Sequence, residues 1–206
     1  VITADSDASG AGDLTVATSM TIDTGNSTTT ITANDFILDG SLSTGTGALN
    51  LLVSDGGTIG LGDADKDYDL SKLEISRITS GATQIGNSTS GSITVDNVSA
   101  ADSDGISGML TLDATKDDAN IVFETLASTF NSLTAKADDG IDLSVDLTTD
   151  TGDLILEADN DNSADTATTG DRIYLNGART LTSAGDMTLD ATTTKISGTS
   201  TIDLSA

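Results

Sequence analysis

Apolar and polar residues alternate along most of the chain in short phrases that open with a turn residue, usually glycine. In "GDMTLDAT", which begins at Gly185, Met187 and Leu189 share one face of an extended segment, and Thr188 and Asp190 share the other. This two-residue period is typical of a β-strand with one buried face. Similar phrases begin at Gly12, Gly47, Gly91, Gly108, Asn131 and Gly152. The pattern predicts an all-β chain of many short strands.

The spacing of these phrases distinguishes two all-β architectures. The starts at Gly91, Gly108, Asn131 and Gly152 are 17, 23 and 21 residues apart (108 − 91, 131 − 108, 152 − 131), within the range of solenoid repeats. A β-sandwich would instead favour hairpins with two-residue Asn-Gly or Asp-Gly turns between matched strands. Here glycine mostly opens the strand, and the chain has no proline, which suits strands paired on both edges. We therefore expect a parallel β-helix (β-solenoid) of about ten irregular coils.

One segment has a helical rhythm. In "LSKLEISRI", Leu70, Leu73 and Ile78 line one side, and Ser71 followed three residues later by Glu74 is a capping-box pattern. The sequence predicts one short helix near 71–78. The segment 123–133 is ambiguous between helix and loop.

Composition excludes several classes of function. The chain of 206 residues has 8 Lys and Arg against 33 Asp and Glu, a formal net charge of −25. Such a charge disfavours nucleic acid and anionic membranes, which attract basic patches, and favours cations. Without His or Cys, the usual zinc, copper, haem and iron–sulfur ligand sets and Ser–His or Cys–His catalysis are unavailable within the chain. No apolar run is long enough to span a membrane.

The acidic stretch "GDADKDYDLSKLE" is the candidate metal site. Counted from Asp63 as a twelve-residue calcium loop, it places oxygen ligands at the loop positions that calcium uses. The expected ligands are Asp63, Asp65, Asp67, Asp69, Ser71 and Glu74. The sixth position is Tyr68 where such a loop normally has glycine. Two interpretations stay open, a Ca²⁺ site and an acidic corner that solvent stabilises. A second loop offers Asp159, Asp161, Ser163 and Asp165 but has no glutamate at its twelfth position.

A longer stretch resembles a known family. "GGTIGLGDADKDYDLSKLEISRITSGATQIGNSTSGSITVDNV", from Gly56 to Val98, is similar to segments of giant bacterial surface proteins of the filamentous-haemagglutinin type. The family pattern is a G-T-I-x-L-G strand, a short L-S-x-x-E-L helix, I-x-x-G-x-x-x-I-G and G-x-I-T-V. The acidic "DADKDYD" departs from it, since the family places small residues there. The resemblance implies a right-handed parallel β-helix, secreted and displayed on the bacterial cell.

These observations together predict a structural role. We expect residues 1–206 to form a single β-helix segment of a longer chain or a polymer. Its function would be that of an extracellular structural or adhesive unit, a rigid stalk or filament of a bacterial surface protein, without catalysis. Its partners would be neighbouring copies or adjacent repeats at the β-helix ends, and a ligand on a host or neighbouring cell. The alternative is a carbohydrate-binding or carbohydrate-cleaving β-helix, although basic and aromatic residues are sparse. An ice-binding solenoid would need a strict Thr-x-Thr ladder, which the irregular spacing does not provide.

Overall fold

Short parallel strands dominate the fold. The computed structural model describes residues 1–161, 171–191, 197–198 and 202–205. Every strand pairing within these ranges is parallel. The all-β prediction is confirmed, and the antiparallel sandwich is excluded for the described residues because a sandwich pairs its strands antiparallel.

The strands form two long sheets and three smaller ones. The eight-stranded sheet contains β1 (Ile2–Thr3), β4 (Thr29–Ala33), β7 (Leu49–Val53), β11 (Thr83–Gly86), β13 (Leu110–Ala114), β16 (Leu133–Ala137), β19 (Leu154–Glu157) and β22 (Met187–Asp190). The seven-stranded sheet contains β9 (Tyr68–Ser71), β8 (Ile59–Gly62), β12 (Ile93–Asp96), β14 (Ile121–Phe123), β17 (Ile141–Leu143), β20 (Ile173–Leu175) and β23 (Ser197–Gly198). The small sheets are β2 (Leu14–Val16) with β5 (Phe36–Leu38); β3 (Thr21–Asp23), β6 (Ser41–Ser43) and β10 (Ile78–Thr79); and β15 (Ser128–Phe130), β18 (Leu147–Thr149), β21 (Arg179–Ser183) and β24 (Ile202–Ser205).

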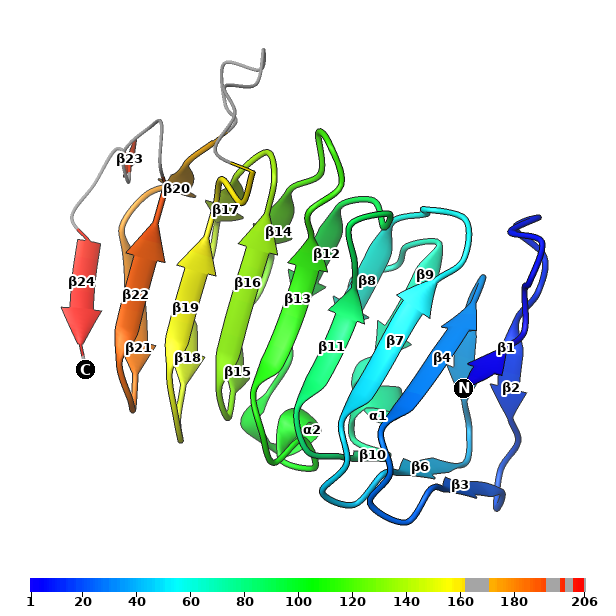
Figure 1. Ribbon diagram of the computed structural model, residues 1–206. Coiled ribbons are helices and arrows are strands. Elements are labelled where there is room, and N and C mark those ends of the chain that lie inside the picture. The colour runs from blue at the N-terminus through cyan, green and yellow to red at the C-terminus, as the bar shows by residue number, and fades with distance from the viewer. Residues whose placement is uncertain (162–170, 192–196, 199–201, 206) are drawn as a thin grey trace.

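The order of the elements repeats along the chain. Each strand of the eight-stranded sheet is followed by a strand of the seven-stranded sheet or, in the first two repeats, by β2 or β5. The chain then passes through a third segment, which holds the strands of the two remaining small sheets and the two short helices, before it returns to the eight-stranded sheet. Successive repeats stack side by side, so the two chain ends lie at opposite ends of the stack (Figure 1). The eight-stranded sheet has one strand per repeat, so the described residues hold eight repeats where the sequence predicts about ten. The difference arises because the longer repeats accommodate loops and one additional strand, β9.

The core consists of ladders of apolar side chains that continue from repeat to repeat. In the eight-stranded sheet, direct register partners join Ile2, Ile31, Leu51, Ile85, Leu112, Ala135, Leu156 and Leu189. In the second sheet, Ile59, Ile93, Ile121, Ile141 and Ile173 form a ladder of isoleucines, all fully buried. Alternation of side chains across a strand sends these residues inward and their polar neighbours outward. The two-residue period of the sequence is therefore the period of the core.

Two short helices interrupt the strands. α1 (Lys72–Ile75) begins at the N-cap Ser71, and the predicted capping box between Ser71 and Glu74 is confirmed. The helix is shorter than the predicted 71–78 because Ile78 already pairs with Leu42 in a strand. α2 (Ala100–Ser103) was not predicted, although Ser99 and Asp102 form a capping box of the same spacing. The ambiguous segment 123–133 contributes to three strands, β14, β15 and β16, and no helix.

Candidate functional site: the acidic crossover

The predicted calcium loop is a crossover between two adjacent parallel strands. β8 and β9 pair in parallel, with Ile59 opposite Tyr68 and Leu61 opposite Leu70. Residues 63–67 must therefore return the chain from the end of β8 to the start of β9. Such connections usually need a dozen residues or more. The short loop achieves the return by lying against β8.

Gly60 makes this close approach possible. A Cβ atom on Gly60 would collide with the carbonyl oxygen of Ala64, which lies over the middle of β8. The loop is also fastened at the start of β8, because Asp67 Oδ2 accepts hydrogen bonds from Thr58 N at 3.1 Å and Thr58 Oγ1 at 2.8 Å. These bonds hold the pKa of Asp67 below its usual range. The first role of the acidic loop is thus to complete the crossover.

Asp63 is occupied by protein partners. Its Oδ2 accepts hydrogen bonds from Lys72 Nζ at 2.8 Å and from Asn97 Nδ2 at 2.6 Å. These bonds lower the pKa of Asp63, and the pKa of Lys72 rises in return. The pair is partly exposed, so it contributes little to stability. A cation at Asp63 would have to displace or share these donors.

Asp69 lies on the outward side of β9 under the acidic loop. Its backbone N donates a 3.0 Å hydrogen bond to Asp35 Oδ1, while its own Oδ1 is buried and has no hydrogen-bond partner. Burial, with repulsion from Glu74, Asp35 and Asp65, raises the pKa of Asp69 to about 6. Burial also raises the pKa of Asp35. Asp69 is therefore the predicted ligand whose charged form is most destabilised by its surroundings.

Glu74 joins two strands that have no backbone pairing. β5 and β9 lie side by side but belong to different sheets. Glu74 Oε2 accepts from Ser71 N at 2.9 Å and from Ser71 Oγ at 2.7 Å, whereas Oε1 accepts from Leu38 N on β5 at 2.9 Å. Arg77 Nη1 adds a 2.6 Å bond to the carbonyl oxygen of Leu38. Side chains thus replace the backbone ladder between β5 and β9.

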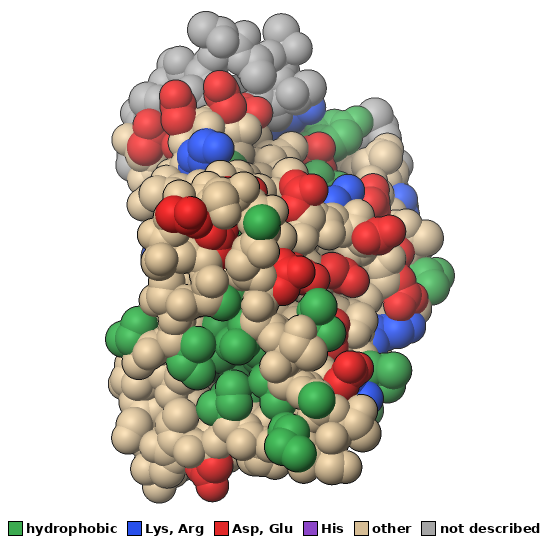
Figure 2. Space-filling model, turned by 90° about the vertical axis from the view of Figure 1, so that its right-hand side faces the viewer, with side chains coloured by type: hydrophobic (Ala, Val, Ile, Leu, Met, Phe, Trp, Pro, Cys, Tyr) green, Lys and Arg blue, Asp and Glu red, His purple; other side chains and the backbone are tan. Residues whose placement is uncertain are grey.

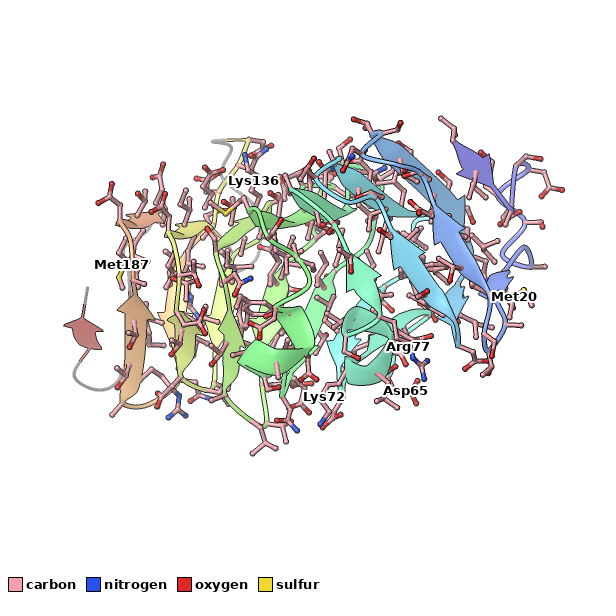
Figure 3. All side chains as sticks on the ribbon, turned by 90° about the horizontal axis from the view of Figure 1, so that it is seen from below. Met20, Asp65, Lys72, Arg77, Lys136 and Met187 are labelled. Atoms are coloured by element: carbon pink, nitrogen blue, oxygen red, sulfur yellow. The ribbon has the colours of Figure 1, made fainter. Side chains whose placement is uncertain are left out.

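The six predicted ligands consequently serve different partners. Asp63 binds Lys72, Asp67 binds Thr58, and Ser71 and Glu74 cap α1. Asp65 is exposed, and Figure 3 labels it together with Lys72 and Arg77. Within the described ranges, no group of three or more Asp, Glu, His or Cys side chains is arranged to hold a metal ion. Calcium binding by this loop stays a prediction, and it would require the carboxylates to exchange their present partners.

The second acidic loop is only partly described. Asp159 is buried and Asp161 is exposed, while Ser163 and Asp165 lie outside the described residues. Asp138 lies close to Asp161, and its Oδ2 accepts a 2.9 Å bond from Asp118 N. Burial raises the pKa of Asp138. The Asp138 carboxylate thus holds the turn at Asp118.

A second cluster, of one basic, one aromatic and one acidic side chain, lies on the outer face of β17 and β20. The guanidinium of Arg172 lies 4.5 Å from the ring centre of Tyr174, whose register partner is Asp142. Burial raises the pKa of Asp142, and Arg172 partly offsets this. The Arg172 guanidinium covers one ring face, so that face is not available to stack on a sugar. No pocket was detected over the described residues.

The end of the molecule that carries β1, β2 and β3 exposes apolar side chains. Figure 2 shows hydrophobic side chains gathered in the lower half of this end, with acidic side chains mostly above them. Ile2, Leu14 and Ile22 pack on the core but are only partly buried, and Met20 is 60% exposed. At the opposite end, Met187 and Leu189 are likewise partly buried, and Figure 3 labels Met20 and Met187 at the two ends. Both ends therefore present partly exposed core residues.

Comparison with known proteins found no matching family model, no matching curated protein and no matching solved structure. No helix in the described ranges is long and apolar enough to cross a membrane.

Sequence reasoning missed Asp35 and Arg77, which lie at the junction of β5 and β9. Asp35 is 34 residues before Asp69 (69 − 35), yet its Oδ1 accepts the Asp69 backbone N–H. Arg77 contacts Leu38, 39 residues earlier. No local pattern marks either contact, because both depend on which repeats become neighbours. The only available signal was the capping box, which correctly placed Glu74 beside Ser71.

Proposed function

We propose that the chain is a right-handed parallel β-helix, closed around its apolar core, that serves as a rigid stalk or filament unit of an extracellular bacterial surface protein. The observation that carries this proposal is the unbroken ladder from Ile2 to Leu189, with one core residue from each repeat. Stacked repeats of this kind resist bending because every repeat is packed and hydrogen-bonded to its neighbours. The right hand is supported by the strong preference of parallel crossover connections for that hand.

The ends support a role in a longer assembly. Edge strands with unpaired backbone groups readily accept a further strand, and solenoids normally need polar caps at their ends. Here Ile2, Leu14 and Ile22 at one end, and Met187 and Leu189 at the other, are only partly covered. We propose that both ends adjoin further β-helix, in adjacent repeats or neighbouring copies. The role is non-catalytic in this proposal, and the acidic surface keeps the stalk soluble.

A distance measurement tests the rigid-stalk proposal. Thr3 and Asp190 are exposed on the end strands of the eight-stranded sheet, and the chain has no native cysteine. Thr3→Cys and Asp190→Cys can therefore carry a donor and an acceptor dye. Seven strand spacings of about 4.8 Å predict roughly 34 Å between the two backbones, as a single narrow distribution. A broad or two-peaked distribution in the intact chain would refute a rigid stalk.

The alternative is carbohydrate binding, for which Arg172, Tyr174 and Asp142 on an outer sheet face are the candidate group, through their polar atoms and not through the ring face that Arg172 covers. An oligosaccharide bound there should be lost in Tyr174→Ala. Isothermal titration calorimetry with soluble acidic and neutral oligosaccharides measures binding to the native chain and to Tyr174→Ala. Saturable binding that depends on Tyr174 would replace the purely structural proposal.

A further inference from the structure

The turn between β20 and β21 contains the one Asn-Gly dipeptide in the sequence, Asn176–Gly177. Asn176 is exposed, its backbone N donates a 2.9 Å bond to Leu143 O, and its Nδ2 donates a long 3.3 Å bond to Ser144 Oγ. Gly177 has a φ of 87°, in the region that favours glycine. The side-chain amide of Asn176 is thus accessible to water and weakly held.

This dipeptide has an intrinsic reaction. The backbone nitrogen of Gly177, after losing its proton, can attack the Cγ of Asn176, which closes a five-membered succinimide and releases ammonia. Water then opens the ring at either carbonyl, leaving aspartate or isoaspartate. Glycine promotes the attack because it has no side chain to shield its nitrogen. Water is the only co-reactant, and no oxidation or reduction occurs.

The structure places a cation beside Gly177, whose backbone nitrogen is the attacking atom. The Arg179 side chain folds back over the turn, and its Nη1 donates a 2.7 Å bond to Ala178 O. A Cβ atom on Gly177 would lie 3.5 Å from Arg179 Nη2 and 3.8 Å from Cζ. The Nε of Arg179 is buried and has no hydrogen-bond partner. A positive charge this close to Gly177 stabilises the anion that forms when the Gly177 nitrogen loses its proton and attacks.

We propose that Asn176–Gly177 is a self-modification site, at which Arg179 accelerates succinimide formation and thereby conversion of Asn176 to aspartate and isoaspartate. Isoaspartate would add a backbone methylene to the turn between β20 and β21. The inference does not depend on the proposed function of the stalk.

The test is timed incubation of the folded full chain at mildly alkaline pH, followed by peptide mass mapping and isoaspartate detection. We expect Asn176 to be converted before Asn26 and Asn87, which precede serine. Asn176→Gln should abolish the reaction at this position, because glutamine would have to close a less favourable six-membered ring. Arg179→Gln should slow conversion several-fold, and Arg179→Lys should restore part of the rate because it keeps the positive charge.

Two controls keep the result interpretable. Arg172→Gln removes an arginine that stacks on Tyr174 before the same turn, and it should leave the rate unchanged. The same chain unfolded in urea reports the intrinsic rate without Arg179 in place, and we expect it to be slower than the folded chain. If the folded chain preserves Asn176 while the unfolded chain converts, the fold protects the turn and the proposal is overturned. An unchanged rate in Arg179→Gln would overturn the role of Arg179.

Discussion

Single residues decide how closely the chain can pack on itself, and Gly60 shows this most directly. The acidic loop passes over β8 only because Gly60 has no side chain to meet the carbonyl oxygen of Ala64. Gly60→Ala should lower the free energy of unfolding by about 1–3 kcal/mol, since the backbone of the loop must move away. Gly152→Ala is a matched control. Its Cβ would meet the Ser132 side chain at 3.1 Å, and the nearest backbone atom, Asn131 O, would lie 3.8 Å away. Thermal unfolding should show a clearly larger loss for Gly60→Ala, and equal losses would contradict the crossover geometry.

Asp69 gives the fold a pH dependence of defined sign. Its pKa of about 6 is raised above the ordinary value of 3.8, so the folded state binds the proton more tightly than the unfolded state. The contribution of Asp69 to stability is therefore full below about pH 4 and is lost as the pH rises through about 6. Asp69→Asn should remove this loss, so its stability relative to the native chain should grow between pH 4 and pH 7.

Denaturant unfolding at a series of pH values measures this difference. Asp150→Asn removes an exposed carboxylate and serves as the control for the general change in net charge. A stability difference for Asp69→Asn that stays constant from pH 4 to pH 7 would show that Asp69 titrates normally.

The two short helices provide a comparison at the scale of elements. Both begin with a capping box, Ser71 with Glu74 and Ser99 with Asp102. Glu74 also accepts the backbone N–H of Leu38, a fully buried residue, whereas Asp102 Oδ2 accepts from the N and the Oγ of Ser99 within its own capping box. Glu74→Ala should therefore destabilise the protein by about 1–3 kcal/mol more than Asp102→Ala, because it leaves a buried donor unsatisfied. Equal melting temperatures for the two variants would show that the Glu74 link between β5 and β9 contributes little.

The acidic loop carries the calcium prediction. If Asp63 and Asp65 turn toward a common ion, millimolar calcium should raise the melting temperature, since a ligand bound only by the folded state stabilises it. The double change Asp63→Asn with Asp65→Asn should remove most of that rise while leaving the Ser71–Glu74 capping box intact. Differential scanning calorimetry with calcium, and with magnesium for comparison, measures the effect. An undiminished calcium response in the double variant would identify general screening of the net charge of −25 as its cause.

At the scale of the whole molecule, the stacked register predicts that one repeat can replace another. Residues 133–153 contain β16, β17 and β18, one complete repeat. Their removal would bring Leu154 opposite Leu110 and Ile173 opposite Ile121, which preserves the inward ladders. The shortened chain should stay folded and lose about 4.8 Å of length, as the dye pair at Thr3 and Asp190 would report. Removing 133–154 instead is the control, because the extra residue sends the β19 core side chains to the outer face and should abolish cooperative unfolding.

The sequence alone determined the strands, their buried faces and the first helix. Two-residue alternation identifies which side chains face inward wherever a strand has one buried face, and the phrases at Gly108 and Asn131 led to β13 and β16, paired in parallel. The capping box placed Ser71 and Glu74 correctly because a cap involves residues only three positions apart. The described residues hold eight repeats and not about ten, because loop length varies independently of the strand pattern.

Only the tertiary structure decided what the acidic side chains contact. Local spacing suggested that Asp63, Asp67 and Glu74 converge on one ion, but their partners come from the preceding strand, from Asn97 in the next repeat and from Leu38 in an earlier one. The insertion of β9 beside β8 sets these contacts. It depends on the missing side chain of Gly60 and on the edge of β5 that has no backbone-paired strand. A two-residue period records which face of a strand is buried, but it does not record which strand lies next to it. The fold could therefore be predicted in outline from short-range patterns, while the site could not, because several of its contacts, such as Asp63 with Asn97 and Glu74 with Leu38, join residues more than thirty positions apart.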